Sequence, residues 1–571
     1  MPSDRFSVIV EKNVPVETRD GVVLRSDVYR PAGDQRCPVL LGRTHYGKDA
    51  WGEWIDPPRT ASQGYVVVIN DMRGQFASDG EFDPFATDVE DSYDVVEWCA
   101  AQEWSDGKVG MFGSSSGGFV QLLAAVSQPP HLVAIAPMQS WSSFGRGNVY
   151  DPGGGYTMLQ WWALLQANID PEHRLGEGRA DYAELRVASA RAQHEISRWY
   201  RHLPLTEFPP LPRELAPWYH RWLEHPDDDG YWAALDVTAH YQRIRTPALH
   251  LVGWFDRFSV GTLRNYAGIL ERGATPQARA HAKLVIGPWP HGVPVRTTSG
   301  DQHFGPAASV DARALVLRWY DHWLKGIDTG MLDEPAVRLY VLGEDVWRDE
   351  PRWPPSRARY TPYYLRSGGR ANTRGGDGAL DTDPPCQEPA DSYLYDPANP
   401  TPSVAGRMAR PDGPTDQGPI EDREDVLVFS TPPLTDDVEV TGPVVARLWA
   451  SSGAPDTDWV VKVCDVYPDG YVQRLSDGMI RARYRQSQSS PVPLEPGRVE
   501  EYRIELLPTS NLFRRGHRIR VEVASANFPA FDRNPNTGNP LGADHAGVPA
   551  VQRIHHDAER PSQVVLPIIP R

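Results

Sequence analysis

Short apolar runs recur along the first quarter of the chain, separated by longer segments with helical spacing. Four of these runs are predicted to be β-strands: residues 38–42, 65–70, 109–113 and 132–137. The run Val66-Val67-Val68-Ile69 has no polar face, which is typical of a strand buried on both sides. The alternation of such strands with helices predicts a parallel sheet covered by helices.

The pattern changes between residues 143 and 241, where Trp, Arg and Glu become frequent. Within 180–200, apolar residues recur at helical intervals: Tyr182, Leu185, Ala188, Ala192 and Ile196. Strand-like runs resume at 248–253 and 282–287, and the helix-like stretch 262–272 between them is long enough for a βαβ crossover. We therefore expect a helical insertion that divides the sheet domain in sequence.

Proline, glycine and aspartate dominate the chain from Trp353 to Asp425, where few periodic signals occur. Short β-rich runs follow at 444–449, 459–467 and 518–523, and Pro468-Asp469-Gly470 is placed like a hairpin turn. Many strands without intervening helices predict a β-sandwich or jelly roll.

These patterns divide the 571 residues into three predicted domains. An α/β sheet domain is formed by residues 1–142 and 242–353, a helical insertion by 143–241, and a jelly-roll β-sandwich by 354–571. The length agrees, since one domain is expected for about every 100–200 residues.

Composition narrows the classes of partner. Hydrophobic residues make up 40% of the chain and charged residues 23%, which is typical of globular proteins. The net charge of -17 disfavours nucleic acid as a partner. The first residues lack the apolar run of a signal peptide, and no apolar stretch approaches the roughly 18–20 residues that cross a bilayer, so we expect no membrane partner. The four cysteines lack Cys-x-x-Cys spacing, which favours reduced thiols in a cytoplasm over disulfides or a zinc site.

The sharpest chemical signal is Gly113-Ser114-Ser115-Ser116-Gly117, which follows the predicted strand 109–113 and precedes the helix-like run 119–127. This is the strand-turn-helix context of a nucleophile elbow, in which small neighbours permit the tight turn that exposes the central hydroxyl. The start of the helix also offers backbone N–H groups to a developing oxyanion. The motif points to Ser115 as a nucleophile, although three adjacent serines also fit a polar loop.

A serine nucleophile needs a base, normally a histidine whose tautomer is fixed by a carboxylate. Asp256 follows the strand predicted at 248–253, and His291 follows the next one at 282–287. The order Ser, Asp, His is that of α/β-hydrolases, and one crossover places acid and base at the same edge of the sheet as the elbow. Taken singly, Asp256 also fits a helix cap and His291 a turn, but the ordered trio favours catalysis.

Other histidines and acids fit this pattern less well. His250 lies inside a predicted strand, His281 precedes one, and His45 would break the usual order. Asp71, which follows an early strand, is the rival acid, and we expect it to pair with Arg73 or with nearby backbone.

The oxyanion of acyl transfer needs donors, typically the N–H after the nucleophile and a group from an early loop. Ser116 supplies the first donor. The loop 43–48 has no His-Gly-Gly-Gly run, so the neutral hydroxyl of Tyr46 is the candidate for the second. A tyrosine that only packs in the core is the alternative.

These residues and their surroundings resemble the family of cocaine esterases, X-Pro dipeptidyl peptidases and α-amino acid ester hydrolases. The similarity covers nearly the whole chain. Besides the elbow, it rests on Asp71-Met72-Arg73-Gly74-Gln75-Phe76-Ala77-Ser78-Asp79-Gly80-Glu81-Phe82, Gly253-Trp254-Phe255-Asp256-Arg257-Phe258, Gly287-Pro288-Trp289-Pro290-His291, Tyr393-Leu394-Tyr395-Asp396-Pro397 and Ser525-Ala526-Asn527-Phe528-Pro529. Together these segments are far more specific than the elbow alone.

The resemblance implies an α/β-hydrolase core, an inserted helical cap and a C-terminal jelly roll. It assigns catalytic roles by position: the triad is Ser115, Asp256 and His291, and the oxyanion hole is Tyr46 with the Ser116 N–H. It also matches Trp161 and Phe258 to aromatic residues that bind the acyl group, and it suggests a homodimer.

Two differences from the family fall in the pocket. Val149 stands where cocaine esterases have a pocket tryptophan, and Met408-Ala409-Arg410 stands where they have bulky apolar residues. The cap is also shorter between Gly154 and Trp161. Cocaine itself is therefore not assumed as a substrate.

The sequence predicts a serine hydrolase that cleaves a carboxylic ester, or a related acyl bond, of a small organic molecule through an acyl-enzyme intermediate. The mechanism requires no metal or cofactor. The alternatives are an amidase, X-Pro dipeptidyl peptidase or β-lactam-type acylase with the same triad, an acyltransferase, and a catalytically idle binding protein. A peptidase would need a carboxylate for the substrate's ammonium group, and Asp227-Asp228-Asp229 in the cap is more typical of a solvated loop.

Overall fold

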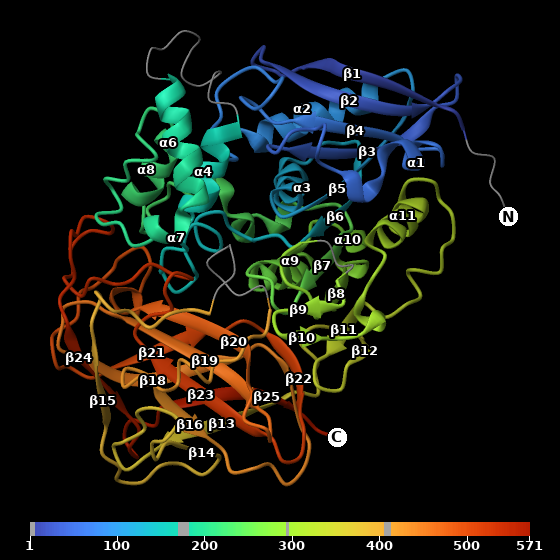
Figure 1. Ribbon diagram of the computed structural model, residues 1–571. Helices are drawn as coiled ribbons and strands as arrows, with labels where there is room; N and C mark the ends of the chain where they lie inside the picture. Colours follow the sequence, from blue (N-terminus) through green and yellow to red (C-terminus); the bar gives the residue numbers. More distant parts are fainter. Residues whose placement is uncertain (1–5, 170–181, 293–295, 405–412) are drawn as a thin grey trace.

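The apolar runs of the first 350 residues form a 10-stranded mixed sheet (Figure 1). The computed structural model describes residues 6–169, 182–292, 296–404 and 413–571. The strands, in their order across the sheet, are β1 (Val8–Glu17), β2 (Val23–Pro31), β4 (Val66–Asp71), β3 (Cys37–Thr44), β5 (Ser105–Ser114), β6 (Leu132–Met138), β7 (Leu249–Gly253), β8 (Lys283–Gly287), β11 (Val337–Val341) and β12 (Val346–Glu350).

The strands from β4 to β11 run parallel, whereas β1, β2 and β12 pair antiparallel at the two edges. The predicted α/β fold class is confirmed. The antiparallel edges extend the parallel sheet that the sequence predicts. These strands show no apolar run in the sequence, because the residues of β1 and β12 are mostly exposed or half-buried and the buried positions of β2 include the polar residues Ser26 and Asp27.

Both faces of the sheet are covered by helices, as the apolar run in β4 requires. Val66 and Val68 belong to an apolar cluster that includes residues of α2 and α3, whereas Val67 and Ile69 belong to a second cluster that includes residues of α11. The helices of this part are α1 (Pro57–Ala61), α2 (Asp88–Ala101), α3 (Ser116–Ser127), α9 (Ser259–Arg272), α10 (Pro276–Ala280) and α11 (Ala312–Trp323). A short hairpin is formed by β9 (Thr298–Ser299) and β10 (Gln302–His303).

A group of helices is inserted between β6 and β7 and lies beside the sheet in Figure 1. Its members are α4 (Gln160–Ile169), α6 (Tyr182–His194), α7 (Ile196–Trp199) and α8 (Pro217–Glu224). The helix predicted over 180–200 is therefore two helices with a break at Glu195, and residues 180 and 181 lie outside the described residues. Packed rings of Trp162, Trp218 and Trp222 join α4 to α8.

The C-terminal part is a 13-stranded, jelly-roll-like β-sandwich, as predicted. Its strands are β13 (Arg359–Arg366), β14 (Ala379–Asp381), β15 (Asp391–Tyr395), β16 (Leu427–Ser430), β17 (Val438–Gly442), β18 (Val445–Ser452), β19 (Asp458–Val466), β20 (Val472–Arg481), β21 (Glu500–Glu505), β22 (Thr509–Phe513), β23 (Arg518–Ala524), β24 (Ala550–His555) and β25 (Gln563–Ile569). The turn at 468–470 joins the antiparallel strands β19 and β20. The strands β13 to β15 were not predicted, because β13 is half-exposed and contains Pro362, whereas β14 and β15 are short and separated by turns.

The cap and the sandwich are joined by a buried polar network. The Tyr156 N–H donates to the carboxylate of Asp532 at 2.8 Å. The Arg481 guanidinium binds the same carboxylate at 2.8 Å and Asp458 at 2.9 Å, and all three charged side chains are nearly inaccessible. This network holds the cap loop that contributes Asn148 and Met158 to the pocket described below.

The proposed domain boundaries fall between β6 and α4, at the 3-10 helix Tyr241–Arg243 just before β7, and between β12 and β13. Within the described ranges, no helix is both long and apolar enough to cross a membrane. The same residues contain no group of three or more His, Cys, Asp or Glu side chains that could hold a metal ion.

Candidate active site

Ser115 lies at the sharp turn between β5 and α3. Its backbone has φ 60° and ψ -120°, a conformation that residues with a side chain rarely adopt. The Ser115 N–H donates to the Met138 carbonyl at 2.9 Å, which ties the turn to β6. A strained serine between a buried strand and a helix has the geometry of a nucleophile elbow.

Glycines on either side make this turn sterically possible. A Cβ on Gly113, where φ is +147°, would lie 2.8 Å from the Gly117 carbonyl oxygen. A Cβ on Gly118 would lie 2.6 Å from the Met138 carbonyl oxygen. Because both obstacles are backbone atoms, the small residues of the motif are required by the close approach of strand and helix.

Asp256 and His291 come together from the loops that follow β7 and β8. His291 Nδ1 lies 3.0 Å from Asp256 Oδ2. The Asp256 side chain is fully buried and its other oxygen accepts the Phe258 N–H at 2.8 Å, whereas 23% of the His291 side chain is exposed. The Phe255 N–H donates to the Trp289 carbonyl at 3.2 Å and so links the two loops. A buried carboxylate held in this way fixes the ring and leaves Nε2 for chemistry.

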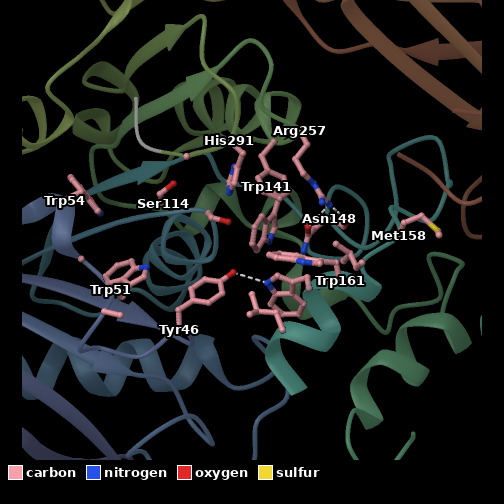
Figure 2. A pocket seen from close by; sticks show the side chains of 18 of the residues that line it. Tyr46, Trp51, Trp54, Ser114, Trp141, Asn148, Met158, Trp161, Arg257 and His291 are labelled. Carbon is pink, nitrogen blue, oxygen red and sulfur yellow. Dashed lines mark hydrogen bonds between the residues drawn. The ribbon is translucent and has the colours of Figure 1, made fainter. Parts of the chain in front are cut away.

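Tyr46 follows β3 and reaches the same cavity. Its hydroxyl oxygen accepts the Trp162 indole N–H at 2.9 Å (Figure 2). Burial of this hydroxyl raises its pKa, and interactions with the Trp162 and Ser116 side chains partly offset this rise. The phenol is therefore neutral at ordinary pH and keeps a proton to donate.

The loop that carries Tyr46 is held by a buried ion pair. Asp71, at the end of β4, accepts both the Lys48 backbone N–H and the Lys48 ammonium at 2.7 Å. Burial raises the pKa of Asp71, and the Lys48 contacts oppose this rise. Of the two partners expected for Asp71, a backbone group is present, whereas Arg73 binds Asp20 and Asp91.

The other histidines that were weighed lie in different surroundings. His45 is buried, with its ring 4.2 Å from that of Tyr46. His250 lies inside β7, where burial lowers its pKa to about 3. His281 follows the short helix α10. None of these three lines the pocket that contains His291, as far as the described residues show.

A cavity of about 740 Å³ brings the predicted residues together. In Figure 2, Tyr46 and His291 point into it from different loops, and Trp161 faces it from the cap. Its described lining is Tyr46, Ala50, Trp51, Gly52, Trp54, Ser114, Ser115, Trp141, Asn148, Met158, Leu159, Trp161, Trp162, Leu165, Tyr200, Arg257, Phe258, His291 and Gly292. Aromatic side chains thus surround the serine and the histidine.

Several lining tryptophans were missed by the sequence analysis: Trp51, Trp54, Trp141 and Trp162. No sequence motif marks these residues, and the high tryptophan content of the chain was the only sign of them. Val149 is fully buried and is not part of the described lining. The segment Met408-Ala409-Arg410 lies outside the described residues.

This arrangement can carry out nucleophilic acyl transfer. A hydroxyl on a strained turn, an imidazole oriented by a buried carboxylate and a neutral phenol adjoin one aromatic cavity. Groups of these kinds can serve as a nucleophile, a base and a donor for an oxyanion.

Two family models match the chain. The X-Pro dipeptidyl-peptidase (S15 family) model matches residues 20–293, and the X-Pro dipeptidyl-peptidase C-terminal non-catalytic domain model matches residues 329–565. The first range contains the elbow, Asp256 and His291, and the second contains nearly all of the β-sandwich.

Individual proteins match over almost the full length. Cocaine esterase from Rhodococcus sp. (strain MB1 Bresler) is 42% identical, over 98% of this chain and 99% of that protein. Among solved structures, an aminopeptidase from a marine sediment archaeon is 27% identical with a TM-score of 0.81, covering 99% of this chain and 97% of that one. An α-amino acid ester hydrolase is 26% identical with a TM-score of 0.80, covering 100% and 98%.

Proposed function

The chain belongs to the family of cocaine esterase and the S15 X-Pro dipeptidyl peptidases, and on this premise we propose that it hydrolyses small-molecule esters through an acyl-enzyme at Ser115. Membership makes it an enzyme of the hydrolase class, similar to serine esterases. The observation that carries the proposal is that His291, held by the buried Asp256 at 3.0 Å, lines the same cavity as the strained Ser115.

In the proposed acylation step, His291 Nε2 takes the proton from Ser115 Oγ as Oγ bonds to the substrate's carbonyl carbon. The Tyr46 hydroxyl and the Ser116 N–H donate to the oxyanion that forms. When the tetrahedral intermediate collapses, the C–O bond to the leaving group breaks, and His291 returns the proton to the leaving oxygen.

Deacylation repeats these roles with water. His291 removes a proton from a water molecule as its oxygen attacks the acyl carbon, and the collapse of the second tetrahedral intermediate releases the carboxylic acid. The proton on His291 then returns to Ser115 Oγ. Throughout, Asp256 keeps Nδ1 protonated and stabilises the imidazolium.

The pocket favours an ester with an uncharged, apolar group on one side. Its described lining is rich in aromatic side chains, with Trp161 and Phe258 among them. None of the described lining residues is Asp or Glu, so they supply no carboxylate for the free ammonium group that an aminopeptidase substrate carries. Of the acidic cap loop, Asp227 instead accepts the Tyr484 hydroxyl at 2.7 Å.

We also keep the homodimer, the cytoplasmic location and the exclusion of nucleic acid as predictions. The location is supported by the four cysteines, Cys37, Cys99, Cys386 and Cys464, all of which are free thiols. An analytical ultracentrifugation run would report the oligomeric state.

The test is hydrolysis of p-nitrophenyl esters with graded acyl groups, including benzoate, by the wild type and Ser115→Ala. Loss of turnover in the folded variant is expected, and the wild type's preference defines the acyl pocket. Turnover at wild-type rates by Ser115→Ala would refute the nucleophile. If the wild type cleaves amides but no esters, the amidase alternative replaces the proposal, and if product forms only with an added alcohol, the acyltransferase does.

A further inference from the structure

The Gln139 side chain bridges the nucleophile turn and the loop of the base. Gln139 follows β6 directly, is 2% exposed and has φ 49°. Its Oε1 accepts the Ser114 hydroxyl at 3.0 Å and the Gly292 N–H at 2.9 Å. Its Nε2 donates to the Pro290 carbonyl at 3.2 Å. Ser114 precedes Ser115, and Pro290 and Gly292 flank His291.

These three contacts determine the orientation of the amide. Ser114 and Gly292 both supply hydrogens, so the atom that faces them is the oxygen, and the Pro290 carbonyl requires the nitrogen. Both acceptor positions of Oε1 are then used. A shorter side chain, or one without both a donor and an acceptor, cannot make this set of contacts.

The backbone of Gln139 is fixed independently of the site. Its N–H donates to the Leu251 carbonyl of β7 at 2.8 Å, and the preceding residue, Met138, accepts the Ser115 N–H at 2.9 Å. The strained φ at Gln139 turns the chain out of β6 at this point. The backbone of Gln139 is therefore anchored to the sheet, while its side-chain amide holds the loop on both sides of His291.

We propose that Gln139 is a positioning residue that sets the distance and orientation of His291 relative to Ser115. The inference rests on the function proposed for these two residues. Gln139 does not belong to the described lining of the pocket, so it acts through the base loop and not by contact with substrate. Its loss is expected to change kcat and leave KM nearly unchanged.

Gln139→Met keeps the length and volume of the side chain and removes all three contacts. Since small displacements of catalytic groups are costly, we expect kcat for a p-nitrophenyl ester to fall by about 10- to 100-fold, with KM within about threefold of wild type. Gln139→Glu keeps the two acceptor contacts, so it is expected to retain a larger share of kcat. It also provides a second variant if Gln139→Met does not fold.

Thr262→Val is the matched control. The Thr262 hydroxyl is buried, accepts the Ser140 N–H at 3.0 Å and donates to the Ser140 carbonyl at 2.9 Å. The variant therefore loosens the residue next to Gln139 without touching the base loop. We expect its Tm to fall while kcat stays within about threefold of wild type, since its buried hydrogen bonds contribute only to stability.

The outcomes distinguish a failure of the positioning role of Gln139 from a failure of the proposed function. A low kcat with an unchanged KM in Gln139→Met, and not in Thr262→Val, supports the positioning role. Wild-type kcat in folded Gln139→Met, an equal loss in both variants, or a change confined to KM overturns it. Ser115→Ala, assayed alongside, is expected to be inactive, and its activity would reject the underlying function instead.

Discussion

Replacing Tyr46 with phenylalanine tests the proposed oxyanion hole by removing a single oxygen atom. The Tyr46 oxygen accepts the Trp162 N–H at 2.9 Å, which leaves its own proton to be donated elsewhere. If that proton stabilises the oxyanion, Tyr46→Phe removes one of two donors. Loss of one such donor typically lowers kcat by about 10²- to 10³-fold, or about 3–4 kcal/mol of transition-state stabilisation.

The same change has a smaller effect on stability. It leaves the Trp162 N–H without its hydrogen-bond acceptor, which costs about 1 kcal/mol for a half-buried donor. Tyr150→Phe is a matched control, because the Tyr150 hydroxyl also makes one buried hydrogen bond, to the Trp222 carbonyl at 2.6 Å, and Tyr150 is not part of the described pocket lining. A general loss of stability would affect both variants.

The assay is steady-state hydrolysis of a p-nitrophenyl ester over a range of concentrations, with folding checked by circular dichroism. We expect Tyr46→Phe to lose kcat by about two to three orders of magnitude with little change in KM, because the oxyanion forms only after binding. Tyr150→Phe is expected to keep kcat near the wild-type value. A folded Tyr46→Phe enzyme with kcat within about threefold of wild type would refute the role of this hydroxyl.

Four other substitutions test the buried acid of the site, the nucleophile turn, the pocket wall and a buried glutamate of the sandwich. Asp256→Asn keeps the shape of the buried acid but no longer fixes the histidine tautomer, so kcat is expected to fall by about 10³- to 10⁴-fold at unchanged Tm, measured by ester hydrolysis and calorimetry; an active variant would contradict the acid role. Gly113→Ala places a Cβ 2.8 Å from a backbone oxygen at a positive φ, so we expect a loss of about 1–3 kcal/mol in stability together with lost activity, and a stable, active variant would show that the turn tolerates a side chain. Trp161→Ala removes an aromatic wall of the pocket and is expected to lower kcat/KM for benzoate esters by about 3- to 10-fold more than for acetate esters, whereas an equal effect on both would remove Trp161 from acyl recognition. Burial raises the pKa of Glu421 above its ordinary value of 4.5, so its ionisation destabilises the folded state, and the stability of the wild type falls as pH rises from about 5 to about 9. Over the same pH range the Tm of Glu421→Gln is expected to fall less than that of the wild type. Parallel Tm profiles of the two proteins would argue against this linkage.

The fold was predictable where the sequence has strong local patterns. The apolar run in β4 identifies a strand buried on two faces, and the glycines around Ser115 identify the strand-turn-helix junction. The strands β13 to β15 were not predictable, because β13 is half-exposed and contains a proline, β14 and β15 are short, and much of their pairing is with distant partners such as β25 and β24.

The residues of the site were predictable where a local sequence pattern places them, and not where tertiary packing alone brings them together. Ser115, Asp256 and His291 each follow a recognisable strand, so their meeting at one sheet edge could be anticipated. The contacts of Gln139 could not be anticipated, since they join residues up to 153 positions apart through a turn with positive φ. Tryptophans such as Trp51 and Trp141 enter the pocket through tertiary packing, which no local pattern encodes.

A covalent intermediate on Ser115 can be detected by mass spectrometry of the enzyme treated with a fluorophosphonate, which reacts with activated serines. We expect a single adduct, mapped to the peptide that contains Ser115, with loss of esterase activity in proportion to labelling. Labelling is expected to be absent in Ser115→Ala and much slower in His291→Ala. Inactivation of the wild type with the adduct on another residue, or equal labelling of folded Ser115→Ala, would show that Ser115 is not the nucleophile.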